Sequence, residues 1–193
     1  MLNTKYLSQL RQKLHTYASK RVEVISKSNE ALHHAKRVIF ALHRDNVVEA
    51  KEKLNHAESM LLDLRKTYQK DNKMMHEGAF LAALEEYVEA KLFFDFVTVG
   101  KIGEIKNLVV DGEVYLAGLC DVPGELYRFA IKAATNRDIK TVQKCADMAQ
   151  EIIGELIEFN LTSYLRTKLD QAKQAVHKLE QVVYEVSLRA WQF

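Results

Sequence analysis

At 193 residues, with 48% hydrophobic and 28% charged residues, the chain has the composition of a soluble globular protein and room for one domain over residues 1–193. Its apolar runs are too short to cross a bilayer, and its N-terminus, MLNTKYLSQLRQKL, lacks the apolar core of a signal peptide, so we expect a cytoplasmic protein. Its two cysteines, Cys120 and Cys145, exclude a disulfide framework and a zinc-binding spacing, and we expect them to be buried free thiols. One proline and seven glycines leave little turn chemistry, which favours a few long helices.

The net charge of +2 is distributed unevenly along the chain. Residues 1–76 hold 15 basic against 8 acidic residues, whereas residues 77–193 hold 13 against 18. Within 85–125 there are 9 acidic and 3 basic residues. A basic half and an acidic segment indicate an anionic partner and a cation site, although solvated helix faces would give a similar distribution.

The first part of the chain predicts two helices. Apolar residues spaced by three and four over 7–42 predict a helix of about forty residues, with Arg21 and Ser28 as polar members of its seam. The same spacing over 47–68 predicts a second helix. Between them, the aspartate or asparagine of HRDN, residues 43–46, is the expected N-cap.

A third helix is predicted over 75–99. Its core stripe is a set of apolar residues at helical spacing: Phe80, Ala83, Tyr87, Ala90, Phe94 and Val97. Glu86 and Glu89 lie on the neighbouring stripe and therefore flank the core.

The rest of the chain predicts a loop and three further helices. The segment after residue 99 is predicted to be a loop or a short helix, with a turn at Asp111–Gly112. A helix over 113–135 contains Pro123, which should kink or restart it. After a turn at 136–138, helices are expected over 138–160 and 165–190. Six or seven long helices without a convincing strand predict an all-α bundle, and the seams of its first and last helices favour association between subunits.

Two carboxylate pairs stand out within this pattern. Glu86 and Glu89 are three residues apart, with Cβ atoms about 5–6 Å from each other, and Asp121 and Glu125 are four apart on another helix. If these helices are neighbours, four carboxylates converge, and two such charges 4 Å apart repel by about 4 kcal/mol near a protein surface. Protonation, exposure to water or a bound cation would relieve this repulsion.

Oxygen-only ligation favours a hard ion, Mg²⁺ or Mn²⁺, which can bind a phosphate oxygen and activate water for attack at phosphorus. Such acidic pairs are also common on solvated helix faces, so spacing alone leaves that interpretation open. A di-iron bundle is disfavoured because Glu30 and His33 form one Glu-x-x-His motif and no second copy exists. No motif for serine, cysteine or P-loop chemistry is present.

Four stretches resemble the translin/TRAX family in order along the chain: SKSNEALHHAKRVIFALHR, EEYVEAKLF, YLAGLCDVPGELYRFAIKAATNRD and KLEQVVYEVSLRAW. The resemblance covers nearly the whole chain from about residue 20. It implies an all-α seven-helix protomer, an octameric hollow shell and binding of single-stranded RNA, with single-stranded DNA as an alternative ligand. In the TRAX branch it further implies Mg²⁺-dependent endoribonuclease activity inside the shell.

Carried over residue by residue, the catalytic carboxylates of that branch fall on Glu86, Glu89 and Asp121, which would hold the metal. Glu125 would be a further ligand or the base that orients water. Pro123 replaces an ordinary helix residue, which puts the relative geometry of Asp121 and Glu125 in doubt. The chain also lacks the long insertion and tails of larger TRAX proteins, so either a homo-oligomer or a hetero-oligomer with a translin-like subunit is expected.

Two functions remain in competition. The first is the ribonuclease, for which Lys36, Arg37, Arg44 and Arg128 are the predicted phosphate contacts. The second is a translin-like RNA or single-stranded DNA binding shell without catalysis, whose affinity would fall steeply with salt and need no divalent ion. Retention of all four acids favours the ribonuclease, because a binder of polyanions gains nothing from a negative cluster.

Overall fold

The computed structural model describes residues 2–190, with side chains described as far as Leu188. Within that range the chain forms seven α-helices and no strand. The helices are α1 (Thr4–His43), α2 (Val47–Tyr68), α3 (Asn72–Met75), α4 (Gly78–Val99), α5 (Gly112–Thr135), α6 (Ile139–Ile157) and α7 (Ser163–Ala190). The predicted all-α architecture is confirmed.

Local side-chain chemistry sets several helix ends. The Asn46 side chain accepts a hydrogen bond from the Glu49 backbone N–H (3.1 Å) and caps α2, and Asp138 caps α6 in the same way through Thr141 (3.0 Å). At the C-terminal end of α4, Gly100 takes a left-handed conformation (φ 76°), and its N–H donates to the carbonyls of Asp95 and Phe96.

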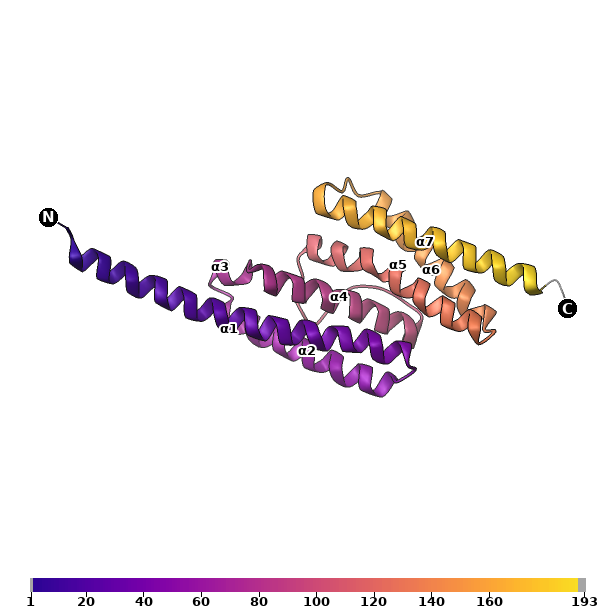
Figure 1. Cartoon of the computed structure of the whole chain (residues 1–193), viewed down its shortest axis with the longest axis horizontal. Helices are drawn as coiled ribbons and strands as arrows, with labels where there is room; N and C mark the ends of the chain where they lie inside the picture. The colour runs from indigo at the N-terminus through magenta and orange to yellow at the C-terminus, as the bar shows by residue number, and fades with distance from the viewer. Residues whose placement is uncertain (1, 191–193) are drawn as a thin grey trace.

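The helices form two groups that meet mainly at one interface. Helix α1 packs against α2 and α4, while α5 packs against α6 and α7, and the contact between α4 and α5 connects the groups. Figure 1 shows the long helices lying roughly along one direction, with the chain termini at opposite ends of an elongated molecule. Both helices that carry the predicted carboxylates therefore line the central interface.

The interior contains the apolar stripes that the sequence predicts. Phe80, Tyr87 and Ala90 of α4 are fully buried, and Val97 is half-buried at the end of the stripe. Cys120 and Cys145 are buried free thiols, as expected. No helix within residues 2–190 is both long enough and apolar enough to span a bilayer.

The structure corrects the predicted start of the third helix at residue 75. Helix α3 ends at Met75, and Glu77 is extended (φ −64°, ψ 129°) before α4 begins at Gly78. Arg21 of α1 donates two hydrogen bonds to the Glu77 carboxylate, at 2.8 and 3.0 Å, and thereby fixes the extended residue. This contact also explains the arginine in the α1 seam.

Two further expectations in the second half are corrected. Of the two outcomes expected at Pro123, a kink or a restart, the restart is wrong, because α5 runs through Pro123 as one element. Helix α6 ends at Ile157 and not at 160. Its last turn tightens as the N–H groups of Glu158 and Phe159 donate to carbonyls three residues back.

The N-terminal half of α1 projects beyond the other helices, as Figure 1 shows. Its apolar seam is buried from Val24 onward but exposed before it, where Leu7, Leu10, Leu14 and Tyr17 are 37–60% exposed. At the other end of the chain, the α7 seam is buried from Leu169 through Leu179 and half-buried at Val183. The predicted position Ala190 lies outside the residues whose side chains are described.

Candidate functional site

Helices α4 and α5, which carry the four predicted acids, approach each other closely at Gly118. A Cβ atom placed on Gly118 of α5 would lie 2.7 Å from the Val88 side chain and 2.8 Å from the backbone oxygen of Glu85. Only glycine fits there without displacing α4. The contact lies within one turn of Glu89 on α4 and of Asp121 on α5, so it fixes the separation of the helices that carry them.

Glu89 is the most buried of the four predicted acids, with 9% of its surface exposed. Among the described residues it has no hydrogen-bond or ion-pair partner. Burial, followed by the nearby carboxylates of Asp121, Glu86 and Glu125, raises the pKa of Glu89 to about 9. The four predicted acids are therefore electrostatically coupled, and without a cation Glu89 carries a proton at neutral pH.

Asp121 takes part in an ion-pair network that reaches a third helix. Lys168 of α7 is 8% exposed and pairs with both Asp121 and Glu85, its ammonium lying 2.7 Å from the Glu85 carboxylate. The Tyr164 hydroxyl donates to the same Glu85 carboxylate at 2.7 Å. Burial raises the pKa of Asp121, against the opposing effect of Lys168. One lysine thus connects α4, α5 and α7 beside the predicted acids.

Glu125 lies on the α1 side of the cluster. His43 of α1 donates from Nε2 to its carboxylate at 2.5 Å, and Arg128 donates to both of its oxygens at 2.9 and 2.8 Å. Burial works against ionisation, but these donors hold the pKa of Glu125 below its usual range. The His43 ring also packs against Phe93 and Phe129, which orient the imidazole. Glu125 is therefore an ionised, well-oriented carboxylate.

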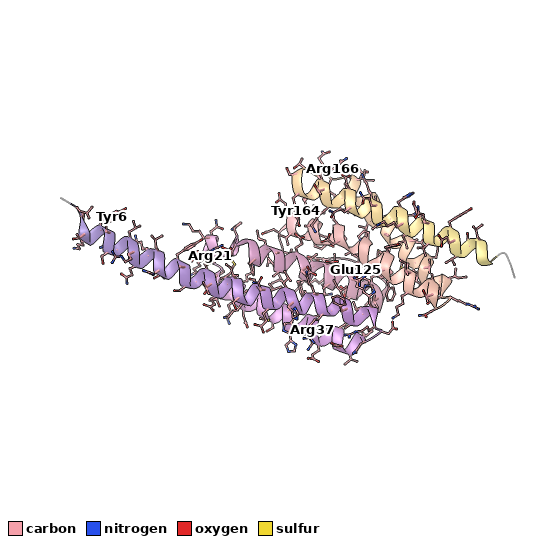
Figure 2. All side chains as sticks on the ribbon, in the orientation of Figure 1. Tyr6, Arg21, Arg37, Glu125, Tyr164 and Arg166 are labelled. Carbon is pink, nitrogen blue, oxygen red and sulfur yellow. The ribbon has the colours of Figure 1, made fainter. Side chains whose placement is uncertain are left out.

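The predicted phosphate contacts separate into two groups. Lys36 lies 3.8 Å from Glu86, and Arg128 binds Glu125, so both adjoin the carboxylates. Arg37 faces the α2 side, near Glu52 and His34, and Arg44 pairs with Glu49 at 3.4 Å. In Figure 2, Glu125 lies within the body of the molecule, whereas Arg37 lies at its edge. Arg37 and Arg44 are thus not brought to the cluster and stay predictions.

The donor set suits a hard cation, but its side chains are not arranged as ligands. Glu86, Glu89 and Asp121 offer only anionic oxygens, and Glu89 has no competing partner among the described residues. Within residues 2–190, however, no group of three histidine, cysteine or acidic residues is arranged to hold a metal ion. Lys168 instead engages Asp121, and Lys36 lies beside Glu86. To bind a metal ion, Asp121 and Glu86 would have to give up their contacts with Lys168 and Lys36.

Sequence reasoning missed Lys168, Glu85 and His43. Lys168 had a usable signal, because it occupies a seam position between Leu165 and Ala172, where a lysine is buried only with a partner. His43 directly follows Leu42, the last residue of the predicted stripe, and ends α1. Glu85 had no such signal, since one helix pattern does not tell which of three glutamates meets the neighbouring helix.

This bundle, with its carboxylate cluster at a central helix pair, has the translin-like fold. The crystal structure of apo-NeC3PO superimposes with a TM-score of 0.86, at 22% identity over 96% of this chain and 98% of that chain. The AfC3PO complex with duplex RNA matches with a TM-score of 0.85, at 26% identity over 95% and 97% of the two chains.

Sequence comparison gives the same assignment. The model of the Translin family matches residues 19–190, and the chain belongs to this family. Translin-associated protein X of Rattus norvegicus is 24% identical over 220 aligned positions, which cover 92% of this chain and 76% of the relative. The predicted family resemblance is confirmed.

Proposed function

We propose that this protein is a Mg²⁺-dependent endoribonuclease that hydrolyses single-stranded RNA inside an oligomeric shell. The observation that carries the proposal is the cluster of Glu86, Glu89, Asp121 and Glu125 at the α4–α5 interface, with Glu89 buried and unpartnered among the described residues. Burying a carboxylate without a partner costs stability, so a functional reason for its presence is required.

Three residues would hold the ion: Glu86, Glu89 and Asp121. Mg²⁺, or Mn²⁺ in its place, would act as a Lewis acid on the phosphodiester and activate a water molecule. Glu125 is kept ionised by His43 and Arg128, so it can accept a proton from water. Lys36 and the half-exposed Arg128 can contact phosphate oxygens beside the cluster.

Several comparisons support an RNA substrate. The chain resembles Translin-associated protein X over most of its length, and the similar AfC3PO has been seen bound to duplex RNA. The basic first half of the chain and the exposed seam of α1 are consistent with a polyanionic ligand and with subunit association. From the family resemblance we infer an octamer, formed either by this chain alone or together with a translin-like subunit.

A non-catalytic RNA or single-stranded DNA binding shell is the second candidate. The observation in its favour is that Lys168 and Lys36 already neutralise part of the cluster, and that no three acids within the described residues are arranged as ligands. In that case Lys168 and its carboxylates would only cross-link α4, α5 and α7.

The direct test is cleavage of a labelled single-stranded RNA by purified wild-type and Glu89→Gln proteins. Each is assayed with Mg²⁺ and with EDTA, and Glu155→Gln, an exposed carboxylate on α6, serves as the matched control. The ribonuclease proposal predicts cleavage by wild type and Glu155→Gln that is lost in EDTA and falls at least 100-fold in Glu89→Gln, roughly the loss of one catalytic group. RNA binding without cleavage under all conditions would favour the binding shell.

A further inference from the structure

One stripe of α1 runs along the rim of the carboxylate cluster. Lys36, Phe40 and His43 are spaced by four and three residues and so lie on one face of the helix. Lys36 lies 3.8 Å from Glu86, and His43 donates to Glu125 at 2.5 Å. Phe40, between them along the helix, therefore faces the same rim as the two residues that contact the acids.

Phe40 is exposed at a position where the fold does not need an aromatic residue. Its side chain is 57% exposed, while its chain neighbours Ile39 and Ala41 are buried in the core. Arg128 lies over the ring, with its guanidinium carbon 5.9 Å from the ring centroid. Because Glu125 holds Arg128 by two hydrogen bonds, the ring has a fixed neighbour on one side and solvent elsewhere.

The surroundings of Phe40 define the ligand that fits there. Two half-exposed cations, Lys36 and Arg128, lie near the ring and suit phosphate groups. An exposed aromatic ring next to cations is the combination that binds single-stranded nucleic acid, because unpaired bases offer a free face for stacking. A duplex offers few such faces, since its bases are already stacked on one another.

We propose that Phe40, supported by Arg128, is a stacking subsite for an unpaired nucleobase adjacent to the carboxylate cluster. The proposal rests on the proposed function and adds to it a cause for preference toward single-stranded RNA. The base stacks on the Phe40 ring, and the neighbouring phosphates reach Lys36 and Arg128. The subsite thereby positions the strand beside Glu86 and Glu125.

The test measures binding in EDTA, where cleavage cannot interfere. The probes are a fluorescein-labelled single-stranded RNA and an abasic strand of the same length and charge, each followed by anisotropy over a range of salt concentrations. The proteins are wild type, Phe40→Ala, Phe40→Trp and Phe159→Ala. Phe159 is a matched control, because it is 49% exposed in the segment between α6 and α7.

We expect Phe40→Ala to weaken binding of the RNA roughly fivefold or more, the effect of losing one base–aromatic stack. Affinity for the abasic strand and the salt dependence should stay as in wild type, because no phosphate contact is removed. Phe40→Trp should restore the affinity, and Phe159→Ala should match wild type.

Two results would overturn the subsite while leaving an RNA-binding protein in place. One is unchanged RNA affinity in Phe40→Ala, and the other is an equal loss on the RNA and on the abasic strand. Failure of the wild-type protein to bind either probe in EDTA would overturn the subsite, while the cleavage assay with Mg²⁺ tests the proposed function separately.

Discussion

At the scale of single residues, Glu89 couples the stability of the fold to the chemistry of the site. Its folded-state pKa of about 9 lies above the ordinary value of 4.5. The folded protein therefore holds a proton that the unfolded chain releases. Stability from this group is fully present below about pH 4.5 and is lost as pH rises toward 9.

We predict that Glu89→Gln stabilises the metal-free protein at pH 8 by roughly 1–3 kcal/mol, because the amide needs no proton to stay neutral in the interface. Near pH 4 the gain should disappear. Urea unfolding in EDTA at both pH values measures the difference, with Glu155→Gln as a surface control. An equal gain at the two pH values would contradict the assigned titration of Glu89.

The partners of Lys168 could not be predicted from the sequence. The helical period placed Glu86 and Glu89 beside the core and predicted convergence with Asp121 and Glu125 only if the two helices are neighbours. The structure brings all four acids near the interface of α4 and α5. The rotation of α7 about its own axis cannot be read from its period. For this reason the burial of Lys168 could be foreseen, but its pairing with Glu85 and Asp121 could not. The absence of a ligand arrangement within the described residues was not foreseeable either.

At the scale of helices, the α4–α5 contact at Gly118 should control both stability and the site. We predict that Gly118→Ala destabilises the protein by about 1–3 kcal/mol, because its Cβ would collide with the backbone oxygen of Glu85. RNA cleavage should fall with it, since α4 must move away from Asp121. Thermal unfolding and the cleavage assay measure the two effects.

The matched control for this change is Gly124→Ala on the same helix, where an added Cβ meets nothing within 4 Å. It should be neutral or stabilising by up to about 1 kcal/mol, as expected for an unstrained glycine in a helix. Equal effects of the two substitutions would show that helix propensity, and not the close approach of α4 and α5, governs this region.

Helix ends were predictable where the cap is local and were missed where it is not. Asn46 lies three residues before the N–H that it caps, so the break between α1 and α2 could be read from four residues. The break before α4 depends on Arg21, 56 residues away from Glu77. Long-range contacts of this kind leave no periodic signal.

At the scale of the whole molecule, the projecting half of α1 carries an apolar seam that no other helix within residues 2–190 covers. Leu10 and Leu14 are among the exposed residues of that seam. Burying such side chains in a subunit contact contributes roughly 1.5–3 kcal/mol each. We predict that Leu10→Glu with Leu14→Glu shifts the protein from a large oligomer to smaller species in light scattering, with unchanged helicity. An unchanged mass would contradict a role of this seam in assembly.

The proposed ribonuclease function requires the carboxylates of α4 and α5 to form one cation site. The measurement that tests this most directly is a Mn²⁺ titration followed by electron paramagnetic resonance, comparing wild type, Glu89→Gln and Glu155→Gln. We predict saturable Mn²⁺ binding to wild type and Glu155→Gln, competed by Mg²⁺ and weakened at least tenfold in Glu89→Gln. Equal Mn²⁺ binding by all three proteins, or none by wild type, would contradict the account.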